Sequence, residues 1–486
     1  MLIIQISPEV YPYAKTGGLA DVVGSLPEHL EGLGNKIVIF MPLFKKVKEN
    51  VSNLINTGIS VNIPIGDSVR KGNVWKTAPH LQTSKTEVYF IQRDEYFHRD
   101  TLYGTEHGDF ADNAERFIFF SRAVLEAVKQ LNLKPDIVHC HDWQSSLVPV
   151  YLKTIYKDEP NFAGTKTVLT IHNLAYQGLF WHWDMKLTGL DWSLFNWRQL
   201  EFWGKLNFLK GGIVFSDAIT TVSPTYAKEI QTQEYGCGIE GVLQTNTGKL
   251  SGIINGIDYS QWNPELDTLI PAKFSAKNIK GKTACKKHLQ QKCELPVKDV
   301  PVIGMITRLA DQKGLDLVVS IFEELMKQDL QFAVLGTGEE KYHRMFRDIS
   351  QKYRDKAAVF IMFNNQLAHE IEAGSDMFLM PSRYEPCGLN QIYSLKYGTV
   401  PIVRATGGLA DTITNASPET LKNGAANGFA FKNYSAQELL QTILRALDAY
   451  KNKTTWAKIR KNGMTQDWSW KRSAREYTDL YKKLRK

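Results

Sequence analysis

The feature that most constrains this chain is an alternation of short apolar runs with longer amphipathic segments, which occurs twice along its 486 residues. Continuous runs rich in Val, Ile and Leu are typical of strands buried on both faces of a parallel sheet. Amphipathic segments between such runs are typical of the helices that cover the sheet. The pattern therefore predicts an α/β fold with two doubly wound domains, and it excludes a single small module.

The predicted strands fall into two groups, one in each half of the chain. The runs in the first half are residues 2–7, 36–41, 87–92, 136–140, 167–172, 218–223 and 250–254. The runs in the second half are residues 302–307, 332–336, 359–363, 377–381 and 400–404. The clearest helix spans residues 113–131, and residues 436–486 predict helices only.

A polar segment with two prolines, Pro264 and Pro271, follows Asn255-Gly256-Ile257-Asp258 and separates the two groups of strands. We therefore expect an N-terminal domain at residues 1–256 and a C-terminal domain at residues 257–466. The last segment, residues 467–486, is expected to form a helix that returns to the N-terminal domain.

Composition excludes several classes of protein. With 59 basic and 51 acidic side chains the net charge is +8, and no run of five Lys or Arg occurs, so nucleic acid is not an expected partner. The five cysteines have neither CxxC nor Cys/His zinc spacing, which predicts reduced thiols, no metal site and a cytoplasmic location. The N-terminal residues read as a strand, because their apolar stretch is too short for a signal peptide or a membrane span, and no membrane is expected as a partner.

Several polar motifs follow predicted strands, where ligands bind in open parallel sheets. After the first strand, Lys15-Thr16-Gly17-Gly18 combines a cation with glycines and a helix start, which predicts a phosphate site. Two later strands end in His139-Cys140-His141-Asp142 and in His172-Asn173. Such side chains can hydrogen-bond sugar hydroxyls or assist proton transfer, although a single buried histidine is more often structural.

The second group of strands carries a similar series. Arg308 and Lys313 follow the first strand of this group and are suited to neutralise a diphosphate. Glu385 and Cys387 follow a later strand, at the start of a helix. Glu385 is the expected carboxylate contact to a hydroxyl-rich group, whereas Cys387 reads as a small packing residue. No Asp-x-Asp pair occurs in the chain, so we expect no metal clamp, and Lys, Arg and helix ends would neutralise the anion.

One hexapeptide, Thr-Gly-Gly-Leu-Ala-Asp, occurs at residues 16–21 and again at residues 406–411, which we call the first and second copies. The first copy follows the first strand of its domain, and the second follows a late strand, so simple duplication does not explain the pair. Recruitment of both copies to one ligand would explain it.

Five of the eleven tryptophans lie within residues 181–203. Sugar faces stack on aromatic rings, so this segment predicts a binding platform for a sugar polymer. The alternative is that an irregular segment packs its rings against the first domain. The sequence leaves both interpretations open.

Six motifs, in this order, resemble those of bacterial glycogen synthases and plant starch synthases. They are residues 15–19, 141–143, 172–178, 308 with 313–314, 385–389 and 406–411. The resemblance runs from residue 1 to about residue 412. It implies a GT-B architecture, with two Rossmann-like domains and the active site in the cleft between them. It also implies a retaining hexosyltransferase that moves glucose from ADP-glucose to the 4-hydroxyl at the non-reducing end of an α-1,4-glucan, without a cofactor.

The resemblance also implies roles for individual residues. The expected catalytic residues are His172, Glu385, Asp142, Arg308 and Lys313. The expected substrate-binding residues are Lys15, Gly18, Asp21, Asn173, Cys387, Gly388, Leu389, Thr406 and Gly407. Lys15, Arg308 and Lys313 would face the diphosphate, and Asp142, His172 and Glu385 the glucose. Many retaining GT-B enzymes carry a second Glu eight positions after the first, where this chain has Tyr393.

Three other functions are possible for a chain with these features, and the sequence argues against two of them. An NAD-dependent dehydrogenase needs Gly-x-Gly-x-x-Gly after its first strand, and Gly17-Gly18 lacks that spacing. A non-catalytic glucan-binding protein would not need the three cations. Another GT-B transferase with a different acceptor stays open, as do the nucleotide base, glycogen or starch as the product, processivity and the oligomeric state.

Overall fold

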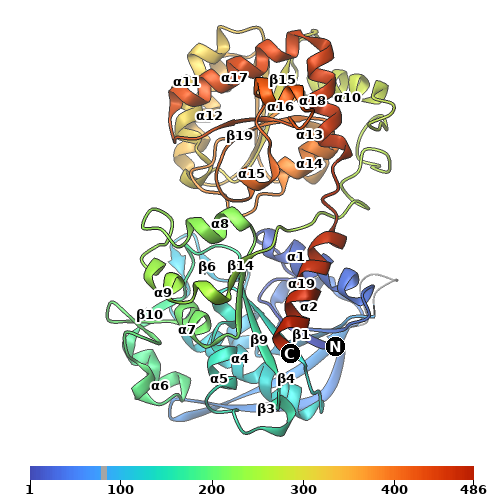
Figure 1. Ribbon diagram of the computed structural model, residues 1–486. Coiled ribbons are helices and arrows are strands. Elements are labelled where there is room, and N and C mark those ends of the chain that lie inside the picture. The colour runs from blue at the N-terminus through green and yellow to red at the C-terminus, as the bar shows by residue number, and fades with distance from the viewer. Residues whose placement is uncertain (78–84) are drawn as a thin grey trace. The chain divides into compact units, whose positions relative to one another are not determined.

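The computed structural model describes residues 1–77 and 85–486, which form two compact units (Figure 1). Unit 1 comprises Met1–Val222, Ala227–Gly256 and Trp470–Lys486, and unit 2 comprises Ser223–Tyr226 and Ile257–Ser469. Each unit has a largely or wholly parallel sheet with helices packed on it. The predicted α/β class with two doubly wound sheets is therefore confirmed.

The sheet of unit 1 has the strand order β14-β13-β9-β8-β1-β2-β5-β4-β3. Its parallel strands are β1 (Leu2–Ile6), β2 (Lys36–Pro42), β5 (Glu87–Gln92), β8 (Ile137–His141), β9 (Lys166–Ile171), β13 (Ala218–Thr221) and β14 (Leu250–Gly252). In chain order these strands read 3-2-1 on one side and 4-5-6-7 on the other, as in a doubly wound sheet.

An antiparallel hairpin extends this sheet, and the sequence analysis did not predict it. The hairpin consists of β3 (Ile55–Ile65) and β4 (Ser68–Thr77), and β4 pairs with β5. Its apolar residues alternate with polar ones because one face is more exposed than the other, so it contains none of the continuous apolar runs that marked the other strands.

Nine α-helices of the described chain precede residue 256, and all lie in unit 1 except α8, whose residues 224–226 belong to unit 2. They are α1 (Gly18–Glu31), α2 (Lys45–Asn50), α3 (Asp94–Phe97), α4 (Asn113–Gln130), α5 (Leu147–Leu152), α6 (Met185–Thr188), α7 (Phe208–Phe215), α8 (Pro224–Glu229) and α9 (Glu240–Thr245). A small antiparallel sheet contains β10 (Leu179–Trp181), β12 (Lys205–Asn207) and β11 (Glu201–Phe202). Another short pair joins β6 (Gly104–Thr105) to β7 (Gly108–Asp109).

The C-terminal helix α19 (Trp470–Arg485) belongs to unit 1 and packs against α1 (Figure 1). Its buried face includes Trp470, Tyr477 and Tyr481. Tyr481 Oη lies 2.8 Å from Nδ1 of the buried His139, in the middle of β8. The last helix is therefore part of the core that supports the parallel strands of unit 1.

The sheet of unit 2 is wholly parallel, in the order β17-β16-β15-β18-β19-β20, which is the 3-2-1-4-5-6 order of a dinucleotide-binding fold. Its strands are β15 (Val302–Ile306), β16 (Gln331–Gly336), β17 (Ala357–Ile361), β18 (Met377–Met380), β19 (Val400–Arg404) and β20 (Phe429–Phe431). The predicted strand at 359–363 is wrong by two residues. The strand ends at Ile361, which pairs with the last residue of β16, and Phe363 is exposed.

Nine helices of the described chain surround this second sheet. They are α10 (Lys280–Lys292), α11 (Leu315–Met326), α12 (Glu340–Lys352), α13 (Asn365–Gly374), α14 (Asn390–Lys396), α15 (Gly407–Thr412), α16 (Pro418–Lys422), α17 (Ala436–Lys451) and α18 (Lys453–Thr465). Within the described residues, none of the helices combines the length and apolar character needed to cross a membrane.

Candidate functional site

Each sheet has a topological switch point, where the strand order reverses and neighbouring loops diverge. In unit 1 this point lies between β1 and β8, and in unit 2 between β15 and β18. The predicted site residues follow the strands at and beside these two points. We call Lys15, Gly18, Asp21, Asp142, His172 and Asn173 half-site 1. We call Arg308, Lys313, Glu385, Cys387, Gly388, Leu389, Thr406 and Gly407 half-site 2.

The loop from β1 to α1 presents Lys15 close to Asp21 in half-site 1. Lys15 Nζ lies 2.7 Å from Asp21 Oδ1, and the Lys15 side chain is 45% exposed. Burial raises the pKa of Asp21, while the Lys15 ammonium group acts to lower it. Gly18 is the first residue of α1. Lys15 is thus available to an anion, with part of its charge already offset.

The sequence analysis missed Glu9, which organises this loop. The buried Glu9 carboxylate accepts hydrogen bonds from the Thr16 amide, from Thr16 Oγ1 at 2.6 Å and from the Gly17 amide at 3.2 Å. The two amides before α1 are therefore used within the protein. The Thr16 and Gly17 amides are not free to bind a phosphate, whereas the predicted backbone contact from Gly18 stays a prediction.

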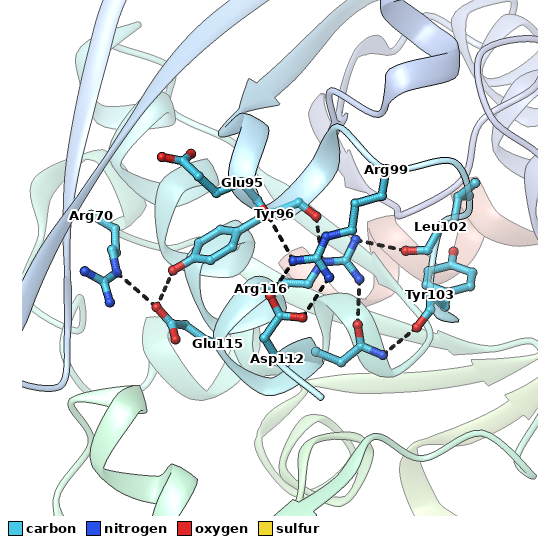
Figure 2. Close-up of polar contacts among 10 residues, drawn as sticks. Arg70, Glu95, Tyr96, Arg99, Leu102, Tyr103, Asp112, Glu115 and Arg116 are labelled. Carbon is cyan, nitrogen blue, oxygen red and sulfur yellow. Dashed lines mark hydrogen bonds and ion pairs between the residues drawn. The ribbon is translucent and has the colours of Figure 1, made fainter. Parts of the chain in front are cut away.

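Glu9 is itself fixed by Tyr103, whose hydroxyl donates to Glu9 Oε1 at 2.8 Å. Figure 2 shows the network that holds Tyr103. The guanidinium of the fully buried Arg116 donates to Leu102 O at 2.9 Å and to Asn113 Oδ1 at 2.6 Å, and Asn113 donates to Tyr103 O. Burial lowers the pKa of Arg116 to about 10, which still leaves it charged at neutral pH. The network thus supports the first copy through Tyr103 and Glu9.

Asp142 follows β8 in an unusual backbone conformation. Its φ is 55° and its ψ is −175°, close to a region that glycine almost alone adopts. Asp142 Oδ1 accepts the His172 amide at 2.7 Å, and the Asn173 amide also donates to this carboxyl. Burial raises the pKa of Asp142 to about 7, with Glu9 adding to the effect and the two amides opposing it. Strained backbone of this kind is concentrated at functional sites.

Three histidines, two in β8 and one directly after β9, form a connected group. The His139 and His141 rings are 4.2 Å apart, and His141 Nδ1 lies 3.0 Å from His172 Nε2. Burial lowers the pKa of His139 and of His172 to about 3 and that of His141 well below its usual range. All three rings are therefore neutral at physiological pH.

The contact between His141 and His172 indicates where their protons lie. One proton must sit between His141 Nδ1 and His172 Nε2. His141 Nε2 is buried without a hydrogen-bond partner in the described part of the chain. A buried acceptor without a donor is tolerated more often than a buried N–H without an acceptor. This favours the proton on His141 Nδ1, so His172 accepts at Nε2 and carries its own proton on Nδ1.

Half-site 2 centres on an ion pair. Lys313 Nζ lies 2.7 Å from Glu385 Oε2, and Ser382 Oγ donates to the same oxygen at 2.9 Å. The Glu385 side chain is almost fully buried, whereas Lys313 is partly exposed. Arg308 is exposed and, among the described residues, makes no ion pair. The side chain of Gln312 joins these elements, because it accepts from Arg308 at 3.3 Å and donates to Tyr384 O at 3.2 Å.

Glycines let three loops of half-site 2 approach one another. A Cβ on Gly407, whose φ is +46°, would lie 1.9 Å from Glu385 O. A Cβ on Gly408 would lie 2.0 Å from Cys387 O, and one on Gly314 would lie 2.1 Å from Pro381 O. Gly388 also has a positive φ, +70°, just before Leu389 and α14. The loops after β15, β18 and β19 thus meet, which brings Lys313, Glu385 and the second copy together.

The chemistry of the two half-sites differs. Half-site 1 offers one buried neutral histidine, two carboxyls of raised pKa and one lysine. Half-site 2 offers an arginine that forms no ion pair with the described residues, and a lysine beside a buried carboxylate. No group of three or more His, Cys, Asp or Glu side chains suited to a metal ion occurs in residues 1–77 and 85–486. The five cysteines, all within these residues, form no disulfide.

Comparison with known families identifies both halves of the chain. Residues 2–245 match the family model described as starch synthase catalytic domain, and residues 287–463 match the model of glycosyl transferases group 1. A glycogen synthase of Koribacter versatilis is 49% identical over 98% of this chain and 97% of its own length. A glycogen synthase of Fervidobacterium nodosum is 48% identical over 100% of this chain and 99% of its own length.

Solved structures agree with these relatives. The catalytic domain of starch synthase IV from Arabidopsis thaliana, bound to ADP and acarbose, matches with a TM-score of 0.91 and 33% identity over 99% of each chain. Sucrose-phosphate synthase from Thermosynechococcus elongatus matches with a TM-score of 0.62 and 17% identity, covering 99% of this chain and 98% of its own, which is a likeness in fold alone.

Proposed function

The chain belongs to the family of glycogen and starch synthases, and we propose that it transfers glucose from ADP-glucose to the 4-hydroxyl at the non-reducing end of an α-1,4-glucan, with retention of configuration. In this reaction the bond between the anomeric carbon and the diphosphate breaks. A bond from that carbon to the acceptor oxygen forms, the acceptor gives up its proton, and ADP leaves.

The observation that carries the proposal is the geometry of half-site 2. Arg308 and Lys313 follow β15, and Glu385 follows the neighbouring β18. Breaking the anomeric bond builds negative charge on the departing diphosphate. Fixed cations therefore stabilise the transition state more than the ground state. We assign Arg308 and Lys313 to the diphosphate and Glu385 to the glucose.

Half-site 1 supplies neutral polar groups for the same reaction. His172, with its proton on Nδ1, is a hydrogen-bond donor to a glucose hydroxyl, and Asp142 lies against its backbone amide at 2.7 Å. A neutral imidazole suits a sugar better than an imidazolium, because positive charge develops on the sugar in the transition state. Lys15 supports the diphosphate. The remaining assigned substrate contacts are Gly18, Asp21, Asn173, Cys387, Gly388, Leu389, Thr406 and Gly407.

The proposed reaction needs neither a metal nor an organic cofactor, because lysine and arginine side chains take the role of a cation clamp. We further propose that the enzyme works in the cytoplasm. Reduced thiols persist in that compartment, and the five cysteines of this chain form no disulfide.

A donor competition assay tests the proposal. Purified protein is incubated with glycogen and either ADP-glucose or UDP-glucose, and release of the nucleoside diphosphate is followed. We expect release with ADP-glucose that depends on glycogen. Release from neither donor, or equal release with and without glycogen, would contradict the assignment.

A further inference from the structure

The tryptophans at residues 181–203 are the most exposed in the chain. Trp181, Trp183, Trp192, Trp197 and Trp203 are between 44% and 86% exposed, and we call these five side chains the tryptophan surface. The other six tryptophans are buried or half-buried. The alternative that this segment packs its rings against unit 1 is therefore wrong for these five. Exposed aromatic groups of this size mark binding surfaces.

An ordered backbone carries the tryptophan surface. The small sheet of β10, β12 and β11 frames the segment. The buried Lys210 donates to the backbone oxygens of Trp197 and Glu201. Tyr151 Oη donates to Thr188 O at 3.0 Å, which ties the segment to α5. The backbone that carries the rings is thus held in place before any ligand arrives, which reduces the entropy that binding must overcome.

Three of the rings form a continuous group. Trp183 lies 6.3 Å from Trp181 and 5.7 Å from Trp192, with interplanar angles of 62° and 72°. Phe195 extends the group at 5.8 Å from Trp192. Edge-to-face packing occupies at most one face of a ring at each contact, so exposed ring area stays available. The half-exposed His182 and Asp184 adjoin these rings and offer hydrogen-bonding groups.

The charges of the segment favour a neutral, hydroxyl-rich ligand. Residues 181–203 contain three acidic side chains and two basic ones. An anionic membrane surface attracts helices and segments with a basic excess, which is absent here. Aromatic rings flanked by hydrogen-bonding groups fit the alternating apolar faces and hydroxyl rims of a sugar chain.

We propose that the tryptophan surface binds an α-1,4-glucan chain as a second attachment site, apart from the residues assigned to glucose transfer. This inference rests on the proposed function, since that function supplies the polymer. A glucan particle carries many chains, so attachment at a second site raises the effective concentration of chain ends at the transfer site. The surface would therefore lower the KM for glycogen and leave short acceptors unaffected.

β-Cyclodextrin separates this site from the transfer reaction, because a ring of α-1,4-linked glucose has no non-reducing end to extend. We expect wild-type protein to bind it in calorimetry. The double variant Trp183→Ala/Trp192→Ala should bind at least about tenfold more weakly. Phe363→Ala is the matched control, since Phe363 is 87% exposed in unit 2 and lies outside the segment. The double variant should also show a raised KM for glycogen and unchanged kcat with maltotriose.

Wild-type protein that binds no cyclodextrin, or a double variant that binds it as tightly as wild type, overturns the inference. If the double variant does not fold, Trp181→Ala decides the matter by the same measurement. A double variant that turns a dimer into a monomer, or that loses binding to anionic vesicles, with cyclodextrin affinity unchanged, also overturns it. Cyclodextrin binding without transfer from either sugar nucleotide would refute the proposed function and leave the binding surface standing.

Discussion

The two copies of Thr-Gly-Gly-Leu-Ala-Asp are identical in sequence and different in structure. In the first copy, Thr16 is held by Glu9, and a Cβ on Gly17 would meet nothing within 4 Å. In the second, Thr406 is fully buried and a Cβ on Gly407 would lie 1.9 Å from Glu385 O. The first copy therefore begins exposed, at residues 16–18 beside Lys15, whereas the second begins buried and packs against the Glu385 backbone. The same six residues therefore have different structural roles in the two units.

The largest difference should appear when each copy gains one methyl group. Gly407→Ala places a Cβ against the Glu385 backbone at a positive φ, so we expect stability to fall by about 2 kcal/mol and turnover by more than about 10²-fold. Gly17→Ala is the matched control. Gly17 has an extended backbone, with φ −151°, and open space around it, so stability should change by less than about 0.5 kcal/mol.

Thermal unfolding and turnover with ADP-glucose and glycogen measure both variants. Equal effects at the two glycines would show that the copies play the same role, and would contradict the difference proposed here.

The cations beside the two copies should also differ in effect. Arg308→Ala should lower turnover by about 10²-fold, the scale for loss of one preorganised donor. Lys15→Ala should lower it less, by about tenfold, because Asp21 already offsets part of the Lys15 charge at 2.7 Å. Steady-state kinetics with varied ADP-glucose gives both values, and Arg344→Ala, a 73% exposed side chain in unit 2, is the control. If turnover of Arg308→Ala stayed within a few-fold of wild type, Arg308 would not be needed to stabilise the departing diphosphate.

Of the two copies, only the first should depend on Glu9. Glu9→Gln keeps the shape of the side chain and removes the charge that strengthens its hydrogen bonds to Thr16 and Gly17. We expect the KM for ADP-glucose to rise by about tenfold, equivalent to about 1.4 kcal/mol, with kcat changed less. Tyr103→Phe removes one donor to Glu9 and should give a smaller change in the same direction. An unchanged KM in both variants would show that the loop does not depend on Glu9.

The last expected effect concerns the pH dependence of stability and arises at Asp142. Its pKa is about 7 in the folded protein, above the ordinary 3.8, so between about pH 4 and 7 the folded state holds a proton that the unfolded state has lost. This contribution to stability therefore declines as the pH rises through that window. His172 acts in the opposite sense, since its pKa is lowered to about 3 and its contribution declines as the pH falls below about 6.5.

Asp142→Asn removes the first contribution and leaves the second. The stability of this variant relative to wild type should rise steadily from pH 4 to pH 7. Unfolding midpoints of the two proteins across that range measure the difference. A difference that does not vary with pH would contradict a carboxyl that is protonated in the folded state.

The sequence predicted the parallel strands well and missed the hairpin of β3 and β4. Continuous apolar runs mark strands buried on both faces, such as β1 and β19, whose predicted bounds differ from the observed ones by at most one residue. The hairpin residues 55–77 alternate in polarity, which a search for continuous runs passes over. The six motifs predicted the family, and the matching family models and relatives confirm it.

The residues that hold the site in place were harder to predict than the motifs themselves. Glu9 is close to the first copy in sequence, but its role depends on Tyr103, 94 residues away. Tyr481 reaches His139 across 342 residues. Neither pair has a local pattern that would reveal it. Gly407 must be glycine because its backbone lies against Glu385, and this contact depends on the order of the strands in the sheet. A single sequence does not reveal it.

The central claim is glucose transfer from ADP-glucose to a glucan, and proton NMR of one reaction tests it most directly. Maltotriose and ADP-glucose are incubated with the protein while the anomeric signals are followed. The account predicts growth of the α-1,4 signal in step with release of an equal amount of ADP. Release of ADP with free glucose and no longer oligosaccharide, or no reaction of ADP-glucose, would contradict it.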